Sequence, residues 1–115
     1  MNGVNKVILV GTLGQDPKLN TSREGKPYTT LNLATNRRWK NKDGKLEQHT
    51  DWHRVHVWGK QGTLCQEWLK KGQPVCVEGH IATSSETGED GKRKWFTFIT
   101  ADDVNFLPSK KDASH

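Results

Sequence analysis

The chain has 115 residues, of which 31% are hydrophobic, so we expect one domain with a single modest core. It carries 18 Lys and Arg against 13 Asp and Glu, and the formal charge of +5 favours an anionic partner. Two isolated cysteines make no disulfide framework, and no apolar run is long enough to cross a membrane, which together predict a soluble cytoplasmic protein.

The first half of the chain contains two predicted strands. Residues 4–10 are a nearly continuous apolar run, typical of a strand buried on both faces. Residues 15–27 hold two prolines and several small polar residues, and predict a loop. Residues 28–35 alternate, with Leu31 and Leu33 on one face, and predict the second strand.

A basic segment follows, at residues 36–48, and surrounds Trp39 with Lys and Arg side chains. Asp43-Gly44 within it is typical of a hairpin tip. We therefore expect a long hairpin loop that leads into a third strand.

Residues 51–58 are the most informative stretch, and we interpret them as that third strand. On one face lie His53, Val55 and Val57, which make a largely apolar surface. The other face carries two indoles, a guanidinium and an imidazole, from Trp52, Arg54, His56 and Trp58. Flat bases joined by phosphates suit such a face, so it predicts a nucleic-acid binding surface.

Between residues 60 and 71 the pattern changes to a helical period. Leu64 is four residues before Trp68, and Cys65 is four residues before Leu69. This spacing predicts a short amphipathic helix with Trp68 in the core and Gly72 as its C′ residue.

Two further strands are expected in the second half of the chain. Residues 73–83 form the fourth, with Val75, Val77 and Ile81 facing inward. The Ser/Gly/Glu-rich residues 84–92 predict a long loop, and residues 95–106 alternate as the fifth strand.

The order of elements predicts the fold class. Five antiparallel strands with one short helix between the third and fourth strands indicate an all-β barrel of the oligonucleotide-binding (OB) type. We place this domain at residues 1–107 and expect residues 108–115 to be a short disordered tail.

Neither metal nor catalytic chemistry is expected. His53 and His56 would point to opposite faces of their strand, and no cysteine lies near them or His49 in sequence. No nucleophile, phosphate-loop or paired His/Cys motif is present, so we expect no cofactor and no enzyme activity.

The sequence also resembles the bacterial and mitochondrial single-stranded DNA-binding proteins over residues 3–106. The motifs that carry the resemblance are Val4-Asn5-Lys6-Val7-Ile8-Leu9-Val10-Gly11, Leu13-Gly14-Gln15-Asp16-Pro17, Leu33-Ala34-Thr35, Thr50-Asp51-Trp52-His53-Arg54-Val55, Trp58-Gly59-Lys60, Leu69-Lys70-Lys71-Gly72 and Val77-Glu78-Gly79. They occur in the order and at the spacing of that family.

The resemblance implies a homotetramer of the bacterial cytoplasm and nucleoid that wraps single-stranded DNA without sequence preference and protects it in replication, recombination and repair. It implies base stacking on Trp39, Trp52 and Trp58, phosphate contacts from Lys6, Arg54, Lys60 and Lys71, and a subunit contact at His53. The charges around Trp39 add Arg37, Arg38 and Lys40 as candidate DNA contacts.

Two departures from the family pattern limit this expectation. Glu86 stands where the family often has another stacking Trp, so we expect weaker binding through that loop. The sequence ends in Lys110-Lys111-Asp112-Ala113-Ser114-His115, without the acidic, Phe-tipped tail of many members. Either a native tail has been removed or this is a short form that does not recruit repair and replication proteins.

Three alternatives stay open at this point. A dimeric primosomal restart protein has the same fold and also lacks an acidic tail. An RNA-binding barrel of the cold-shock kind would prefer RNA. A protein-interaction barrel would use the Trp face as an interface and would show no response to nucleic acid.

Overall fold

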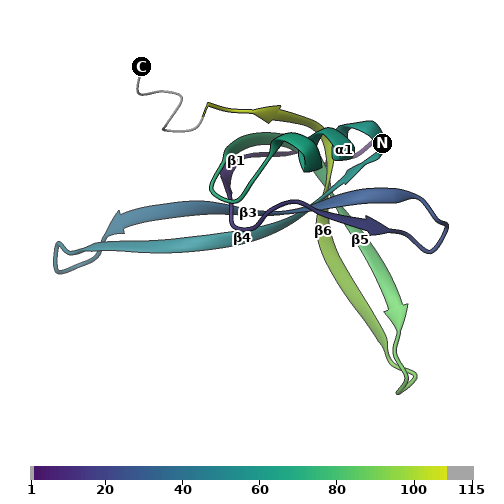
Figure 1. Cartoon of the computed structure of the whole chain (residues 1–115). Helices are drawn as coiled ribbons and strands as arrows, with labels where there is room; N and C mark the ends of the chain where they lie inside the picture. The colour runs from purple at the N-terminus through teal and green to yellow at the C-terminus, as the bar shows by residue number, and fades with distance from the viewer. Residues whose placement is uncertain (1, 109–115) are drawn as a thin grey trace.

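A computed structural model describes residues 2–108 of the protein, so most of the predicted tail lies outside the described residues. The described part forms six strands and one helix (Figure 1). In chain order they are β1 (Val7–Leu13), β2 (Lys18–Thr21), β3 (Pro27–Lys40), β4 (Leu46–Trp58), α1 (Gly59–Trp68), β5 (Pro74–Thr87) and β6 (Arg93–Phe106).

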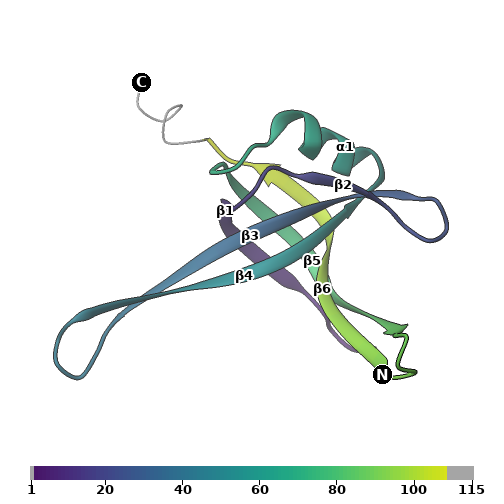
Figure 2. The same cartoon turned by 60° about the horizontal axis from the view of Figure 1, so that its bottom comes forward.

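Five of these strands close into a barrel, which confirms the predicted fold class. The strand order is β1-β5-β6-β4-β3, and β1 closes the ring by pairing with β3 at Thr12↔Ala34 and Leu13↔Leu33. The pairing of β4 with β6, at Val55↔Ile99 and His56↔Thr100, is parallel, and the other pairings are antiparallel. In chain order the helix lies between β4 and β5, the third and fourth strands of the barrel. In space it lies at one end of the barrel (Figure 2).

The core consists of the inward side chains of the barrel and one face of α1. Its members are Leu13, Leu31, Leu33, Val55, Val57, Cys65, Leu69, Val75, Val77, Ile99 and Val104. Burial raises the pKa of the Cys65 thiol to about 11, so it stays protonated at neutral pH.

The helix packs closely on β3 and β4 because Gly62 has no side chain. A Cβ at Gly62 would collide with the carbonyl oxygen of Val57. The buried Thr29 hydroxyl donates a hydrogen bond of 2.9 Å to the carbonyl oxygen of Gly62. This contact fixes α1 over one end of the barrel.

Each segment predicted as a loop is partly strand, and to that extent the prediction is wrong. Within residues 36–48, β3 continues to Lys40 and β4 begins at Leu46, leaving only a tight turn in which Gly44 has φ +77°. Likewise β5 runs to Thr87 and β6 begins at Arg93. The paired strands project from the barrel as two ribbons (Figures 1 and 2), which we call the β3–β4 ribbon and the β5–β6 ribbon. Residues 15–27 contain β2, which pairs with β3.

Two predictions of strand burial are also corrected. The first strand is not buried on both faces: Ile8 and Val10 are 61% and 60% exposed, because one face of β1 lies on the outside of the barrel. Ile81 does not share the burial of Val75 and Val77. It pairs with Ile99 at the level where β6 stops pairing with β4, so its inner side is only partly covered.

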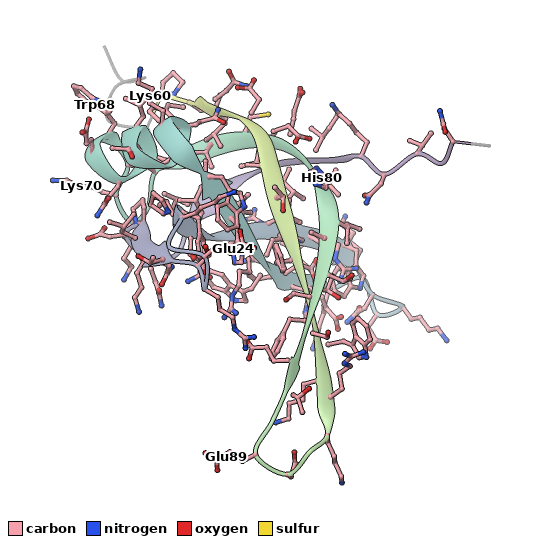
Figure 3. All side chains as sticks on the ribbon, turned by 90° about the vertical axis from the view of Figure 1, so that its right-hand side faces the viewer. Glu24, Lys60, Trp68, Lys70, His80 and Glu89 are labelled. Atoms are coloured by element: carbon pink, nitrogen blue, oxygen red, sulfur yellow. The ribbon has the colours of Figure 1, made fainter. Side chains whose placement is uncertain are left out.

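The helix prediction is right in place and wrong in detail. Trp68 is 67% exposed and Leu64 is also exposed, because α1 buries the face that carries Cys65 and the helix ends at Trp68 (Figure 3). Gly72 is not the C′ residue. It lies beyond the end of the helix with φ +90°, and its N–H donates to the carbonyl oxygen of Leu13 at 2.8 Å.

Candidate nucleic-acid interface

An open groove crosses the outer surface of the barrel. It has a volume of about 900 Å³, and its floor is the outward face of β3 and β4. β2 borders it on one side and the β5–β6 ribbon on the other. From the floor come Tyr28, Thr30, Asn32, Trp52, Arg54 and His56.

The alternation of β4 places the predicted face in this groove. Val55 and Val57 are fully buried in the barrel, which turns the intervening residues outward. Trp52 is 63% exposed, and Arg54 beside it is exposed as well. The large, flat apolar ring and the guanidinium are therefore presented to solvent together, as the sequence predicted.

A row of aromatic rings crosses the floor. The sequence predicted its members His56 and Trp58, but sequence reasoning did not identify Tyr28 and Phe98 as part of the site. Tyr28 lies 4.7 Å from both His56 and Trp58, measured between ring centroids. His56 stacks on Phe98 at 4.1 Å, with an interplanar angle of 26°. The available signal was the alternation of β3, which puts Tyr28 on the face opposite Leu31 and Leu33. The contact with Phe98 depends on the parallel pairing of β4 with β6, which no local pattern reports.

His56 is held neutral within this row. Its partial burial lowers the pKa of the imidazole, and the positive charge of Arg54 lowers it further. A neutral ring stacked on Phe98 acts as part of an aromatic surface rather than as a cation.

Trp58 ends β4 and connects the groove to a second hollow. This smaller hollow, of about 430 Å³, lies between Trp58 and the turn that joins β2 to β3. Arg23, Glu24 and Lys26 line it, and Lys26 Nζ lies 3.9 Å from Glu24 Oε2. The aromatic row thus continues toward a turn with two basic side chains and one acidic one.

The predicted cations are distributed over the molecule. Arg54 lies in the groove, where Lys18 of β2 is a further basic residue that the sequence reasoning missed. Lys6 forms an exposed ion pair of 3.5 Å with Glu78. Lys60 is the second residue of α1, and Lys71 lies in the turn after the helix, where its backbone N–H donates to Asp16 Oδ1 at 2.8 Å. Lys6, Lys60 and Lys71 do not line the groove.

Trp39 and its basic neighbours lie on the β3–β4 ribbon, outside the groove. Trp39 pairs with Glu47, while Trp52 pairs with Ala34, so the alternation puts the two indoles on opposite faces of the ribbon. Arg38 and Lys40 share the face of Ala34. The ribbon therefore offers one exposed Trp on one side and free cations on the other.

Arg37 is partly neutralised by a carboxylate. Its Nε donates to Asp51 Oδ2 at 2.9 Å, and His49 Nε2 lies 3.3 Å from Asp51 Oδ1. The hydrogen bond from Arg37 holds the pKa of Asp51 below its usual value. Because this ion pair occupies its guanidinium, Arg37 is less available to a phosphate than Arg38 is.

His53 lies on the inner side of β4, away from the Trp face. Its Nε2 is 2.9 Å from the hydroxyl oxygen of Thr35, and both side chains are partly buried. A subunit contact at this residue stays a prediction. Within residues 2–108, no group of three or more His, Cys, Asp or Glu side chains is arranged to hold a metal ion. In the same part of the chain, no helix is long and apolar enough to cross a membrane.

Glu86 introduces negative charge at the rim of the groove. It lies on the β5–β6 ribbon, and its Oε1 is 3.9 Å from Nη2 of Arg23, on the turn after β2. The two side chains are exposed and face each other from the two sides of the groove. A carboxylate at this position repels phosphates. It also pairs with Arg23, a cation that could otherwise contact phosphates.

The sequence matches a known family over most of its length. A family model described as "Single-strand binding protein family" matches residues 4–107. The "Single-stranded DNA-binding protein" of Xylella fastidiosa is 43% identical over 110 residues, which are 96% of this chain and 67% of that protein. The protein of the same name from Xanthomonas axonopodis pv. citri is 43% identical over 105 residues, 91% of this chain and 58% of that protein. This chain therefore spans roughly three-fifths to two-thirds of the length of these two relatives.

The fold matches solved structures as well. The "Plasmodium falciparum SSB complex with ssDNA" superposes with a TM-score of 0.80 at 30% identity, covering 94% of this chain and 98% of that one. A deletion mutant of the single-stranded DNA binding protein from Thermus aquaticus gives a TM-score of 0.80 at 28% identity, covering 96% of this chain and 53% of that one.

Proposed function

Because this chain belongs to the single-strand binding protein family, whose model matches residues 4–107, we propose that it binds and protects single-stranded DNA without reading its sequence. The observation that carries the proposal is the outward face of β4. There Trp52 and Arg54 lie side by side in an open groove of about 900 Å³ that has a floor of aromatic rings.

Binding in this groove combines two kinds of contact. Bases stack on Trp52 and on the row of Tyr28, Trp58 and Phe98, and each stacked base contributes about 1–3 kcal/mol. Every base has a π-face, so stacking does not discriminate among sequences. Arg54 and Lys18 contact phosphates along the same path.

The cations outside the groove have a different role in this proposal. Trp39, with Arg38 and Lys40 on the other face of the ribbon, receives DNA that continues beyond the groove, and Lys6, Lys60 and Lys71 contact it on the sides of the barrel. Each phosphate neutralised on a single strand makes the slope of log K against log salt steeper by about 0.7. Affinity is therefore expected to fall strongly with salt.

The wider biology follows the family. We place residues 1–107 in the DNA-binding domain and propose that the protein acts by binding alone, without catalysis, in replication, recombination and repair in the bacterial cytoplasm and nucleoid. It assembles as a homotetramer with His53 near a subunit contact. Light scattering would test this assembly: four subunits support it, and two would favour the restart-protein alternative.

The proposal is tested by titrating the intrinsic tryptophan fluorescence with oligo(dT) at low and high salt. Saturable quenching that weakens with salt is expected, because Trp52 and Trp58 would stack on bases. Unchanged fluorescence at low salt would mean that the Trp face contacts protein instead. A matched RNA oligonucleotide that binds more tightly than DNA would favour the cold-shock alternative.

A further inference from the structure

A second tryptophan–arginine pair lies outside the groove, on the β5–β6 ribbon. Trp95 is 67% exposed, and the Cζ atom of Arg93 lies 5.7 Å from the centroid of its ring. The ribbon projects away from the barrel and ends at the turn that carries Glu89 (Figure 3). No contact with the barrel explains why a large indole stands in solvent at this position.

In the paired residues 83–87 and 93–97 of the ribbon, only one face carries a carboxylate. Side chains alternate along each strand, and Glu86 pairs with Lys94 while Ser85 pairs with Trp95. The face directed to the groove therefore carries the carboxylate of Glu86, with the ammonium of Lys94 opposite it. On the face of Trp95, the β5 residues are Thr83, Ser85 and Thr87, which carry hydroxyls and no charge. Arg93 is thus the charged side chain nearest the indole on that face, with no carboxylate opposite it.

The arginine also arranges the site for a ligand. A guanidinium within about 6 Å of an indole centroid is attracted by the ring quadrupole, which restricts both side chains before a ligand arrives. The indole stays largely exposed and can accept a base by stacking, while the guanidinium keeps donors for a phosphate. The serine and threonine hydroxyls around them can donate hydrogen bonds to the sugar-phosphate backbone of the same DNA strand.

The position of the pair also continues the path from the groove. Phe96 and Phe98, which line the groove, come one and three residues after Trp95 along β6. A strand of DNA that leaves the groove past Phe96 meets the edge of the ribbon. Trp95 is the neighbouring residue on β6, on the other face of that edge. An anionic, flat-based ligand fits both the charge of this face and its continuity with the groove.

We propose that Trp95 and Arg93 form a second stacking site, on the face of the β5–β6 ribbon opposite the groove, for single-stranded DNA that has left the groove. This inference rests on the proposed function and adds a site to it. On the groove face of the ribbon, Glu86 stands where the family often has a stacking Trp. The Trp95 site supplies base stacking on the other face of the same ribbon. It lengthens the stretch of DNA that one barrel holds.

The test compares short and long oligo(dT) on the intact protein. An oligonucleotide of about 8 nucleotides fits within the 4–16 nucleotides that one OB fold covers, and one of about 30 nucleotides exceeds that range. Trp95→Ala is compared with Trp68→Ala, an equally exposed tryptophan that lies on α1 at the other end of the molecule from the ribbon tip (Figure 3). Arg93→Lys keeps the charge but removes the planar group.

The site predicts that Trp95→Ala weakens binding of the long oligonucleotide by at least about fivefold, the lower limit for one stacked base, and leaves the short one within twofold. Arg93→Lys weakens the long one by a smaller factor, and Trp68→Ala changes neither. Equal affinity of Trp95→Ala and Trp68→Ala for the long oligonucleotide would overturn the proposal. So would a loss of affinity accompanied by a changed subunit count in light scattering, which would assign Trp95 to a protein contact. Failure of the wild-type protein to bind even the short oligonucleotide would instead reject the proposed function.

Discussion

The indole of Trp52 lies against the backbone of Gly14, and its six-membered ring occupies the space that a Cβ of residue 14 would need. The φ angle of Gly14 is not in the left-handed region, so the backbone alone would accept other residues. Gly14 immediately follows β1, and its N–H donates to the carbonyl oxygen of Asn32 on β3 at 2.9 Å. The end of β1 thereby supports one side of the ring at the groove.

Gly14→Ala is expected to weaken DNA binding with little effect on folding. The added methyl group pushes the exposed Trp52 ring out of its position, while the core residues below are untouched. We expect the Kd for short oligo(dT) to rise by about fivefold, equivalent to about 1 kcal/mol of stacking. Gly3→Ala is the matched control, because nothing lies within 4 Å of a Cβ there. Equal affinities of the two variants would show that Gly14 does not position the indole.

Glu86→Gln is expected to tighten binding. The substitution removes a carboxylate from the rim of the groove and releases Arg23, 3.9 Å away, to contact phosphate. Exposed charge pairs are worth about 0.2–1 kcal/mol, so the gain in affinity is at most about fivefold at low salt and shrinks as salt rises. Glu89→Gln, at the ribbon tip, controls for the change in net charge. A variant at Glu86 that binds no better than the one at Glu89 would contradict a role for this carboxylate in the groove.

Arg54→Ala is expected to change the salt dependence as well as the affinity. If Arg54 neutralises one phosphate, the slope of log K against log salt becomes shallower by about 0.7. Arg54→Lys retains the charge, and its slope should match that of the wild-type protein. Measuring Kd at several salt concentrations for the three proteins checks this; an unchanged slope in Arg54→Ala would remove Arg54 from the phosphate path.

His56 is expected to make the protein less stable in mild acid. Burial and then Arg54 lower its pKa in the folded state below the ordinary value of 6.5. The unfolded chain therefore binds the proton more readily, so the contribution of His56 to stability is complete above pH 6.5 and is lost as the pH falls through the lower folded pKa. His56→Gln, which cannot titrate, should show a flatter decline in the free energy of unfolding across this window. Identical pH profiles for the two proteins would rule the effect out.

Gly62→Ala is expected to destabilise the fold. A Cβ there would collide with the carbonyl oxygen of Val57 and crowd the hydroxyl of Thr29, both of which are buried. Overpacking of this kind costs about 1–3 kcal/mol in the free energy of unfolding, measurable by denaturant titration. Below the unfolding transition, affinity for an oligo(dT) of about 8 nucleotides, within the range of one OB fold, should change little because α1 lies away from the groove. A variant as stable as the wild-type protein would show that α1 can shift at no cost.

The sequence predicted the barrel and the Trp face because both depend on local alternation. Val55 and Val57 must be buried, and this requirement turns Trp52 and Arg54 outward whatever the rest of the fold does. The ribbons could not be predicted in the same way. Beyond the barrel both faces of β3–β4 and β5–β6 meet solvent, so their residues carry no apolar period, and backbone pairing alone makes them strand.

Contacts between distant strands were the other source of error. The stacking of His56 on Phe98 follows from the parallel pairing of β4 with β6, and Tyr28 meets Trp58 through the register of β3 with β4. Trp68 fits the helical period as well as Cys65 does, but the helix is too short to bury both sides.

The central claim is that the outward face of β4 holds single-stranded DNA. The most direct test measures the Kd for oligo(dT) of about 8 nucleotides, within the range covered by one OB fold, for the wild-type protein, Trp52→Ala and Trp68→Ala. The two tryptophans are 63% and 67% exposed, so the variants lose similar apolar surface. We predict that Trp52→Ala binds about 5- to 150-fold more weakly, from the loss of one stacked base, while Trp68→Ala stays within twofold of the wild type. Equal affinities for all three proteins would contradict the account.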